Sequence, residues 1–192
     1  MSIEFYEQNA QLFFDGTIDV DMRDIYERFT KGLSKGCYIL DAGCGSGRDT
    51  KAFLDMGYKV DAFDASEALC ELSSKQTGIE VKHATFNDVT AVSQYDAIWC
   101  CASLLHVPEN ELQRVLNKLA TSLKAGGIWY VSFKYGDGER VKGGRHFTDL
   151  NEHKLELLVS ELPNITVKTT WVSEDNRPDR NERWLNALLA KV

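Results

Sequence analysis

Short apolar runs and amphipathic helical patterns alternate along the chain from Cys37 onward. Consecutive apolar residues are typical of strands buried on both faces, whereas apolar residues spaced by three and four are typical of helices with one buried face. The expected strands span residues 37–43, 58–63, 79–84, 95–102 and 128–134, and the expected helices span residues 48–57, 66–76 and 108–127. The alternation predicts right-handed β-α-β units, and therefore a mostly parallel sheet with helices on both faces.

The helix expected at residues 108–127 has the clearest pattern in the chain. Its apolar face comprises Leu112, Val115, Leu116, Leu119 and Leu123. Pro108 suits the first turn, where no amide hydrogen is needed, and Gly126 suits the end of a helix. We therefore expect this helix to pack its leucine face against the sheet.

The alternation of strands and helices stops in the last 42 residues. A helix is expected over residues 151–162, with Asp149 and Glu152 spaced as a capping box. Strands are expected over residues 165–172 and 183–192, and the polar stretch between them leaves no room for a crossover helix. These two strands are therefore predicted to be antiparallel to each other.

Two segments fall outside the expected sheet. Residues 1–36 contain two amphipathic patterns ahead of the first strand, and we predict that they form a helical lid. Residues 135–148 are rich in glycine and charge, and we predict a loop that borders the substrate side of a ligand cleft.

Length and charge limit the classes of protein that fit. A chain of 192 residues suits one domain, with small additions. The net charge of −7 and the lack of a basic stripe argue against a nucleic-acid partner. No secretory signal or membrane-spanning run is visible, so we expect a cytoplasmic protein without a membrane partner. Five cysteines without a C-x-x-C pair favour neither disulfides nor a structural zinc site.

The stretch "LDAGCGSGRDT" places Gly43, Gly45 and Gly47 directly after the first strand. Glycines here allow a tight turn and let a ligand approach the bare backbone. A dinucleotide fingerprint would need its third glycine at position 48, where the chain has Arg48. A negative charge on Asp41 would repel a pyrophosphate and attract a cation, so the loop favours a ligand with positive charge.

Polar and aromatic residues follow the second and third strands. Asp64 ends the second strand, where a carboxylate can accept both ribose hydroxyls of a nucleoside. Asn87 or Asp88 could face an adenine amino group, and Phe86 could stack on the ring. A nucleoside with a cationic, amino-acid-like tail satisfies these positions, and S-adenosylmethionine is such a ligand.

The chain resembles the class I S-adenosylmethionine-dependent methyltransferases, within them the small-molecule group that includes tellurite-resistance-type enzymes. The stretches that carry the resemblance are "FYEQNA", "ILDAGCGSGRDT", "YKVDAFDAS", "YDAIWCCASLLHV", "LKAGGIWYVSFK" and "RWLNALLAK". The resemblance implies an α/β fold, a three-layer Rossmann-like sandwich whose seven-stranded, mostly parallel sheet has its last strand antiparallel. It implies one methyltransferase domain over residues 1–192, with S-adenosylmethionine as cofactor and a small molecule as substrate.

Site residues carry over by their match to the family's motifs. The candidate cofactor-binding residues are Tyr6, Asp41, Gly43, Cys44, Gly45, Gly47, Arg48, Asp64, Ala65, Asn87, Asp88 and Cys101. His106 follows the fourth strand and is either a general base or a packing residue near Pro108. Lys134, Arg145 and His146 together would suit an anionic substrate. No set of oxygen ligands for a catalytic metal is evident.

Two other classes remain as alternatives. A nicotinamide-dependent oxidoreductase is disfavoured by Arg48 and by the lack of a separate substrate domain. A regulatory module that binds S-adenosylmethionine without transferring a methyl group fits the same motifs. The sequence does not decide between a monomer and a homodimer.

Overall fold

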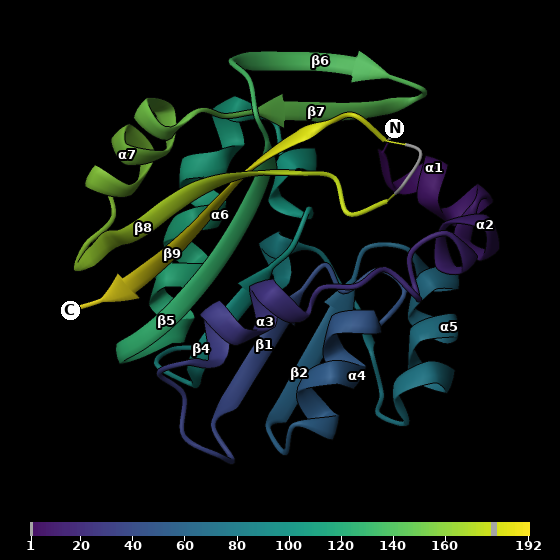
Figure 1. Ribbon diagram of the computed structural model, residues 1–192, viewed down its shortest axis with the longest axis horizontal. Helices are drawn as coiled ribbons and strands as arrows, with labels where there is room; N and C mark the ends of the chain where they lie inside the picture. Colours follow the sequence, from purple (N-terminus) through teal and green to yellow (C-terminus); the bar gives the residue numbers. More distant parts are fainter. Residues whose placement is uncertain (1, 178–179) are drawn as a thin grey trace.

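A seven-stranded sheet forms the middle layer of the computed structural model, which describes residues 2–177 and 180–192 (Figure 1). The strands are β1 (Tyr38–Ala42), β2 (Lys59–Asp64), β3 (Lys82–His83), β4 (Tyr95–Cys100), β5 (Leu123–Lys134), β8 (Ile165–Glu174) and β9 (Arg183–Lys191). Their order is β3-β2-β1-β4-β5-β9-β8. Only β9 runs in the opposite direction to the other strands of this sheet, so the predicted fold class is confirmed.

Helices cover both faces of the sheet because successive strand residues point to opposite sides. On one face, Ile39 of β1 and Trp99 of β4 pack against α3 (Arg23–Thr30) and α4 (Arg48–Asp55). α5 (Glu67–Thr77) packs on β2 on the same side. On the other face, Leu40 and Ile98 pack against α6 (Glu109–Ser122) and α7 (Glu152–Ser160).

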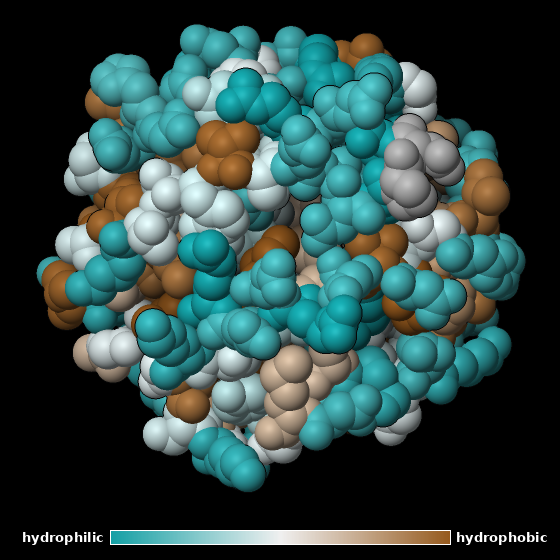
Figure 2. All heavy atoms as spheres, viewed as in Figure 1, coloured by the Kyte–Doolittle hydropathy of each residue, from teal (hydrophilic) through white to brown (hydrophobic). Residues whose placement is uncertain are grey.

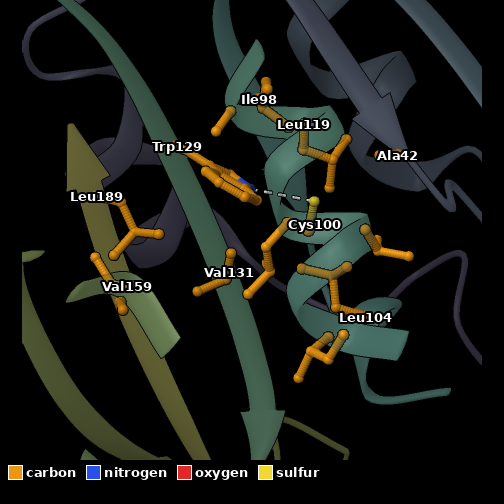
Figure 3. Close-up of a cluster of buried hydrophobic side chains, with 14 of the residues drawn as sticks. Ala42, Ile98, Cys100, Leu104, Leu119, Trp129, Val131, Val159 and Leu189 are labelled. Carbon is orange, nitrogen blue, oxygen red and sulfur yellow. Dashed lines mark hydrogen bonds between the residues drawn. The ribbon is translucent and has the colours of Figure 1, made fainter. Parts of the chain in front are cut away.

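The larger core lies between the sheet and α6 (Figure 3). Trp129 of β5 is fully buried there, and its indole Nε1 donates a hydrogen bond to Cys100 Sγ at 3.3 Å. Leu119 of α6 faces the same region, as the leucine pattern predicts. Cys100 is a buried free thiol.

The chain joins the sheet earlier after α6 than the sequence predicts. The helix ends at Ser122 and not near Gly126, because Leu123 already pairs with Tyr95 of β4. Gly126 lies within β5 with a φ of 78°, and it does not end a helix. The expected third strand is also shorter, since only Lys82 and His83 pair with β2.

The segment 135–148 is mostly a β-hairpin, so the prediction of an irregular loop is wrong. Strand β6 (Gly138–Lys142) pairs with β7 (Arg145–Asp149) in antiparallel register. Gly143 and Gly144 connect them with φ values of 57° and 74°, as a two-residue hairpin turn requires. The hairpin lies above the carboxyl ends of the parallel strands, next to the N-terminal helices (Figure 1).

The expected capping box of the last helix is also wrong. Asn151 caps α7, since its side chain accepts from the amide of Lys154. Asp149 belongs to β7 instead, where its carboxylate pairs with Arg140.

The N-terminal region forms three helices. α1 (Ser2–Gln8) and α2 (Ala10–Asp15) lie beside α5 at the carboxyl edge of the sheet (Figure 1). α3 belongs to the core, because Tyr26 and Phe29 are buried against Trp99. Among the described residues, no helix has both the length and the apolar content that crossing a membrane requires.

We predict that Leu119→Ala lowers the free energy of unfolding by about 2–5 kcal/mol, because it removes a fully buried side chain and leaves a cavity. Leu157→Ala on α7 is the control, since Leu157 is 55% exposed and its truncation leaves no cavity. Urea unfolding of both variants measures the difference. Equal losses in the two variants would contradict the assigned core.

Candidate active site

A cavity of about 400 Å³ lies at the carboxyl edge of the sheet. Its walls come from the loops after β1, β2, β3 and β4, from the ends of β5 and β8, and from the first residues of β7 and β9. The N-terminal helices α1 and α2 also line the cavity, through Ser2, Ile3, Tyr6 and Phe13. Near the middle of the face in Figure 2, apolar residues lie recessed among hydrophilic ones. Ligands of open parallel sheets bind at this edge.

The glycine loop after β1 forms one wall of the cavity. Gly43 and Gly45 have φ values of 81° and 55° and line the cavity. A Cβ on Gly43 would lie 2.5 Å from Ser103 Cβ, and one on Gly45 would lie 2.9 Å from the ring of Phe13. The bare backbone is therefore required for the turn and also for the close approach of Phe13 in α2.

Gly47 has a different role from the other two glycines. It does not line the cavity, and a Cβ there would lie 2.9 Å from Ser73 and Thr77 of α5. Its φ is 76°, so both the backbone conformation and the packing of α5 need glycine. Cys44 and Ser46, which alternate with the glycines, line the cavity.

Asp64 lies on the cavity wall at the end of β2, as predicted. Its two carboxylate oxygens accept backbone hydrogen bonds from Gly45 at 2.9 Å and from Ser66 at 3.0 Å. Burial raises the pKa of Asp64 despite these bonds. Each oxygen keeps a second lone pair, so the carboxylate can accept two further hydrogen bonds from a ligand. Ala65 lines the cavity beside it.

Asp41 does not line the cavity. It is 1% exposed, and the hydroxyl of Thr50 donates to its Oδ2 at 2.6 Å. Burial raises the pKa of Asp41 to about 8, and the nearby charge of Asp49 acts in the same direction. Because Asp41 does not line the cavity, its carboxyl does not face a ligand there directly, in contrast to the expectation from the sequence.

Asp49 is a buried carboxylate that the sequence analysis did not single out. It accepts hydrogen bonds from the Tyr26 hydroxyl at 2.5 Å, from Trp99 Nε1 at 2.8 Å and from Arg48 Nε at 2.7 Å. Burial opposes its ionisation, but the charge of Arg48 and these bonds lower its pKa. Tyr26 and Trp99 lie far from Asp49 in the sequence and reach it only in the folded chain, so no local motif predicts these hydrogen bonds.

Arg48 and Cys101 meet on the floor of the cavity. Arg48 Nη2 lies 3.9 Å from Cys101 Sγ, and both residues line the cavity. The guanidinium pairs with Asp49, so its charge is compensated within the protein. Burial raises the pKa of Cys101 to about 12, and the thiol is neutral at pH 7.

The segment after β3 is only partly at the cavity. Phe86 and Asn87 line it, and the ring of Phe86 meets Phe63 edge to face. Asp88 does not line the cavity. Its carboxylate accepts hydrogen bonds from the amide and the hydroxyl of Thr85, and it thereby caps a short 3₁₀ helix, η1 (Phe86–Asp88). The spacing of Asp88 after Thr85 is a capping box, a signal that the sequence carries.

His106 and Tyr6 are hydrogen-bonded across the cavity. His106 Nδ1 lies 2.7 Å from the carbonyl oxygen of His146, and its Nε2 lies 2.8 Å from the Tyr6 hydroxyl. Because a carbonyl only accepts, Nδ1 carries the hydrogen, and Nε2 of the neutral ring accepts from Tyr6. Burial lowers the pKa of His106 to about 4, so the ring is neutral at pH 7.

No group of three or more His, Cys, Asp or Glu side chains within residues 2–177 and 180–192 is arranged to bind a metal ion.

Comparison with known proteins shows what parts of this chain are similar to. Residues 39–127 match a family model described as a methyltransferase domain. A ubiquinone biosynthesis O-methyltransferase of Rickettsia conorii is 30% identical over 112 residues, which cover 56% of this chain and 38% of that protein. The chain spans 32% and 38% of the length of the first curated relatives that it matches.

Solved structures share the fold at low identity. A 1,6-didemethyltoxoflavin-N1-methyltransferase of Burkholderia thailandensis, crystallised with 1,6-didemethyltoxoflavin and S-adenosylhomocysteine, has a TM-score of 0.80 at 20% identity, covering 99% of this chain and 85% of that one. The [4+2]-cyclase SpnF has a TM-score of 0.77 at 16% identity, covering 98% and 94%. The chain therefore has the Rossmann-like fold of the class I methyltransferases, a fold that also hosts a cyclase.

We predict that Glu7→Ala loosens the N-terminal helices. Glu7 of α1 accepts hydrogen bonds from the Ser66 hydroxyl at 2.6 Å and from the Ala68 amide at the start of α5. Without them, amide hydrogen exchange over residues 2–15 should be several-fold faster. Glu4→Ala is the control, since Glu4 is exposed on the same helix. Equal exchange in both variants would mean that Glu7 does not hold the N-terminal helices in place.

We also predict that His106 stays neutral from pH 8 down to about pH 5 in the folded chain, because burial lowers its pKa to about 4. In the unfolded chain it should titrate near its ordinary value of about 6.5. The unfolded state thus binds the proton first as the pH falls, so this residue's contribution to stability is lost between about pH 6.5 and pH 4. Nitrogen-15 NMR of the imidazole, with and without urea, measures both titrations. A folded-state midpoint near 6.5 would contradict the assigned burial.

Proposed function

We propose that the chain is an S-adenosylmethionine-dependent methyltransferase that acts on a small-molecule acceptor. The observation that carries the proposal is Asp64, which ends β2 on the cavity wall with a free lone pair on each oxygen, facing the glycine loop. The methyltransferase-domain match spans the glycine loop, Asp64, Asn87 and His106. The fold supports the same class.

The residues of the cavity fit the cofactor. Asp64 would accept from the ribose hydroxyls, and the backbone from Gly43 to Gly45 would border the methionine part. Phe63 and Phe86 offer apolar rings for the adenine, with Asn87 beside them as a hydrogen-bonding partner. Asp41, Gly47 and Asp88 act indirectly in this proposal, because they shape the surrounding loops without lining the cavity.

The bound cofactor supplies a methyl group on a cationic sulfur, which is already activated for transfer. The protein's own contribution is therefore position and exclusion of water. Phe13 of the lid lies against Gly45 of the glycine loop, Tyr6 packs on Phe13, and Arg48 with Cys101 form the floor. Arg48 is neutralised by Asp49, which avoids an uncompensated positive charge beside the sulfonium.

The size of the cavity supports a small acceptor. At about 400 Å³ and with an N-terminal lid, it suits a ligand that enters whole rather than one segment of a polymer. Tellurite-resistance chemistry and a cytoplasmic location remain predictions from the sequence. The regulatory module that binds without transfer is the second candidate, because this fold also serves an enzyme named as a cyclase.

We predict that S-adenosylhomocysteine binds the chain and that Asp64→Ala weakens the binding by about tenfold or more, through loss of charge-assisted hydrogen bonds. Asp55→Ala is the control, since Asp55 is an exposed residue on α4. Isothermal titration calorimetry measures each affinity, with NAD as the competing ligand. Binding of NAD alone would refute the proposal. If S-adenosylhomocysteine binds but S-adenosylmethionine loses no methyl group to any member of a broad acceptor panel, the regulatory module would be favoured.

A further inference from the structure

We propose that the acceptor binds as an anion whose negative charge faces Arg145 of β7. This inference rests on the proposed function, because it concerns the acceptor side of the same cavity. Arg145 lines the cavity next to Tyr6 and Phe147. A small substrate bound next to the N-terminal helices would therefore lie close to the positive charge of Arg145.

Most charged residues of the cavity are already paired within the protein. The ion pairs are Arg48 with Asp49, Lys134 with Glu182, and Arg177 with Asp175. Asp64 lies on the cofactor side, where it accepts two backbone amides. Among residues 2–177 and 180–192, Arg145 has no carboxylate partner. Its charge is therefore available to a ligand.

The surroundings of Arg145 hold its guanidinium in a fixed and largely apolar place. The group lies 4.5 Å from the ring centre of Phe5 and 5.3 Å from that of Phe147. Its Nε is buried with no hydrogen-bond partner in the described part of the chain, and Nη1 reaches the Tyr6 hydroxyl at 3.5 Å. A buried donor without a partner is costly, and an anion supplies the missing acceptor.

The neighbours of Arg145 favour an acceptor that needs no base. His106, the candidate base, has its Nε2 occupied by the Tyr6 hydroxyl. Burial lowers its pKa to about 4, and the charges of Arg145 and Lys134 act in the same direction. An anionic oxygen or sulfur needs no proton removed. It would form a bond to the methyl carbon while the carbon–sulfur bond breaks, and that electron pair stays on the sulfur.

Matched ligand pairs test the charge preference directly. The probes are benzoate with benzamide, salicylate with salicylamide, and phenylacetate with phenylacetamide, each titrated into the full chain saturated with S-adenosylhomocysteine. We expect the acids to bind at least tenfold more tightly than their amides. Arg145→Gln should abolish the preference, and Arg145→Lys, which keeps the charge without the planar fork, should retain part of it. Arg23→Gln, on an exposed pair, should behave as the unmodified chain.

Equal binding of acids and amides, or no binding of any acid at millimolar concentration, would overturn the inference. So would a preference that survives Arg145→Gln. If Arg145→Gln fails to fold, Arg145→Met repeats the measurement, because it keeps an apolar stem against Phe5 without the charge. The titration of S-adenosylhomocysteine itself comes first. Its failure would count against the proposed function, whereas normal cofactor binding with no acid preference would count against the role of Arg145 alone.

Discussion

The site depends most on the hydrogen bonds and the ion pair of the buried Asp49 carboxylate, which join the N-terminal helix α3 to the floor of the cavity. An ionised group in this position is stable only with donors on every side, and it receives them from Arg48, Tyr26 and Trp99. These partners come from α4, α3 and β4, so one charge ties a helix ahead of the sheet to the middle of the sheet. It also holds Arg48 beside Cys101, and its charge helps to raise the pKa of the neighbouring Asp41.

Sequence reasoning located the elements that repeat a simple pattern. The existence and order of the parallel strands, the leucine face of α6 up to Leu119, the turn of the glycine loop and the position of Asp64 at the end of β2 all follow from local spacing. Local spacing does not predict features that depend on contacts between segments far apart in the sequence. Leu123 leaves α6 because Tyr95 offers a strand partner, and Asp49 becomes ionised because Tyr26 and Trp99 reach it. Neither partner can be read from the neighbouring residues.

The hairpin of β6 and β7 has a local signal in the sequence. Two adjacent glycines between Val141 and Phe147 are the ordinary sign of a two-residue turn. The charged composition of the segment suggested a loop instead. The difference matters for the site, because a paired strand holds Arg145 and the carbonyl of His146 in place, and that carbonyl in turn fixes the tautomer of His106.

The position of the first helix beside the cavity, where Glu7 holds it to the start of α5, has a practical consequence for handling the protein. Ser2 lines the mouth of the cavity, whereas Val192 follows the end of β9 at the opposite edge of the sheet (Figure 1). Any affinity tag or fluorescent fusion joined ahead of Ser2 would therefore crowd the entrance and compete with the seating of the first helix. The same fusion after Val192 would leave the entrance clear.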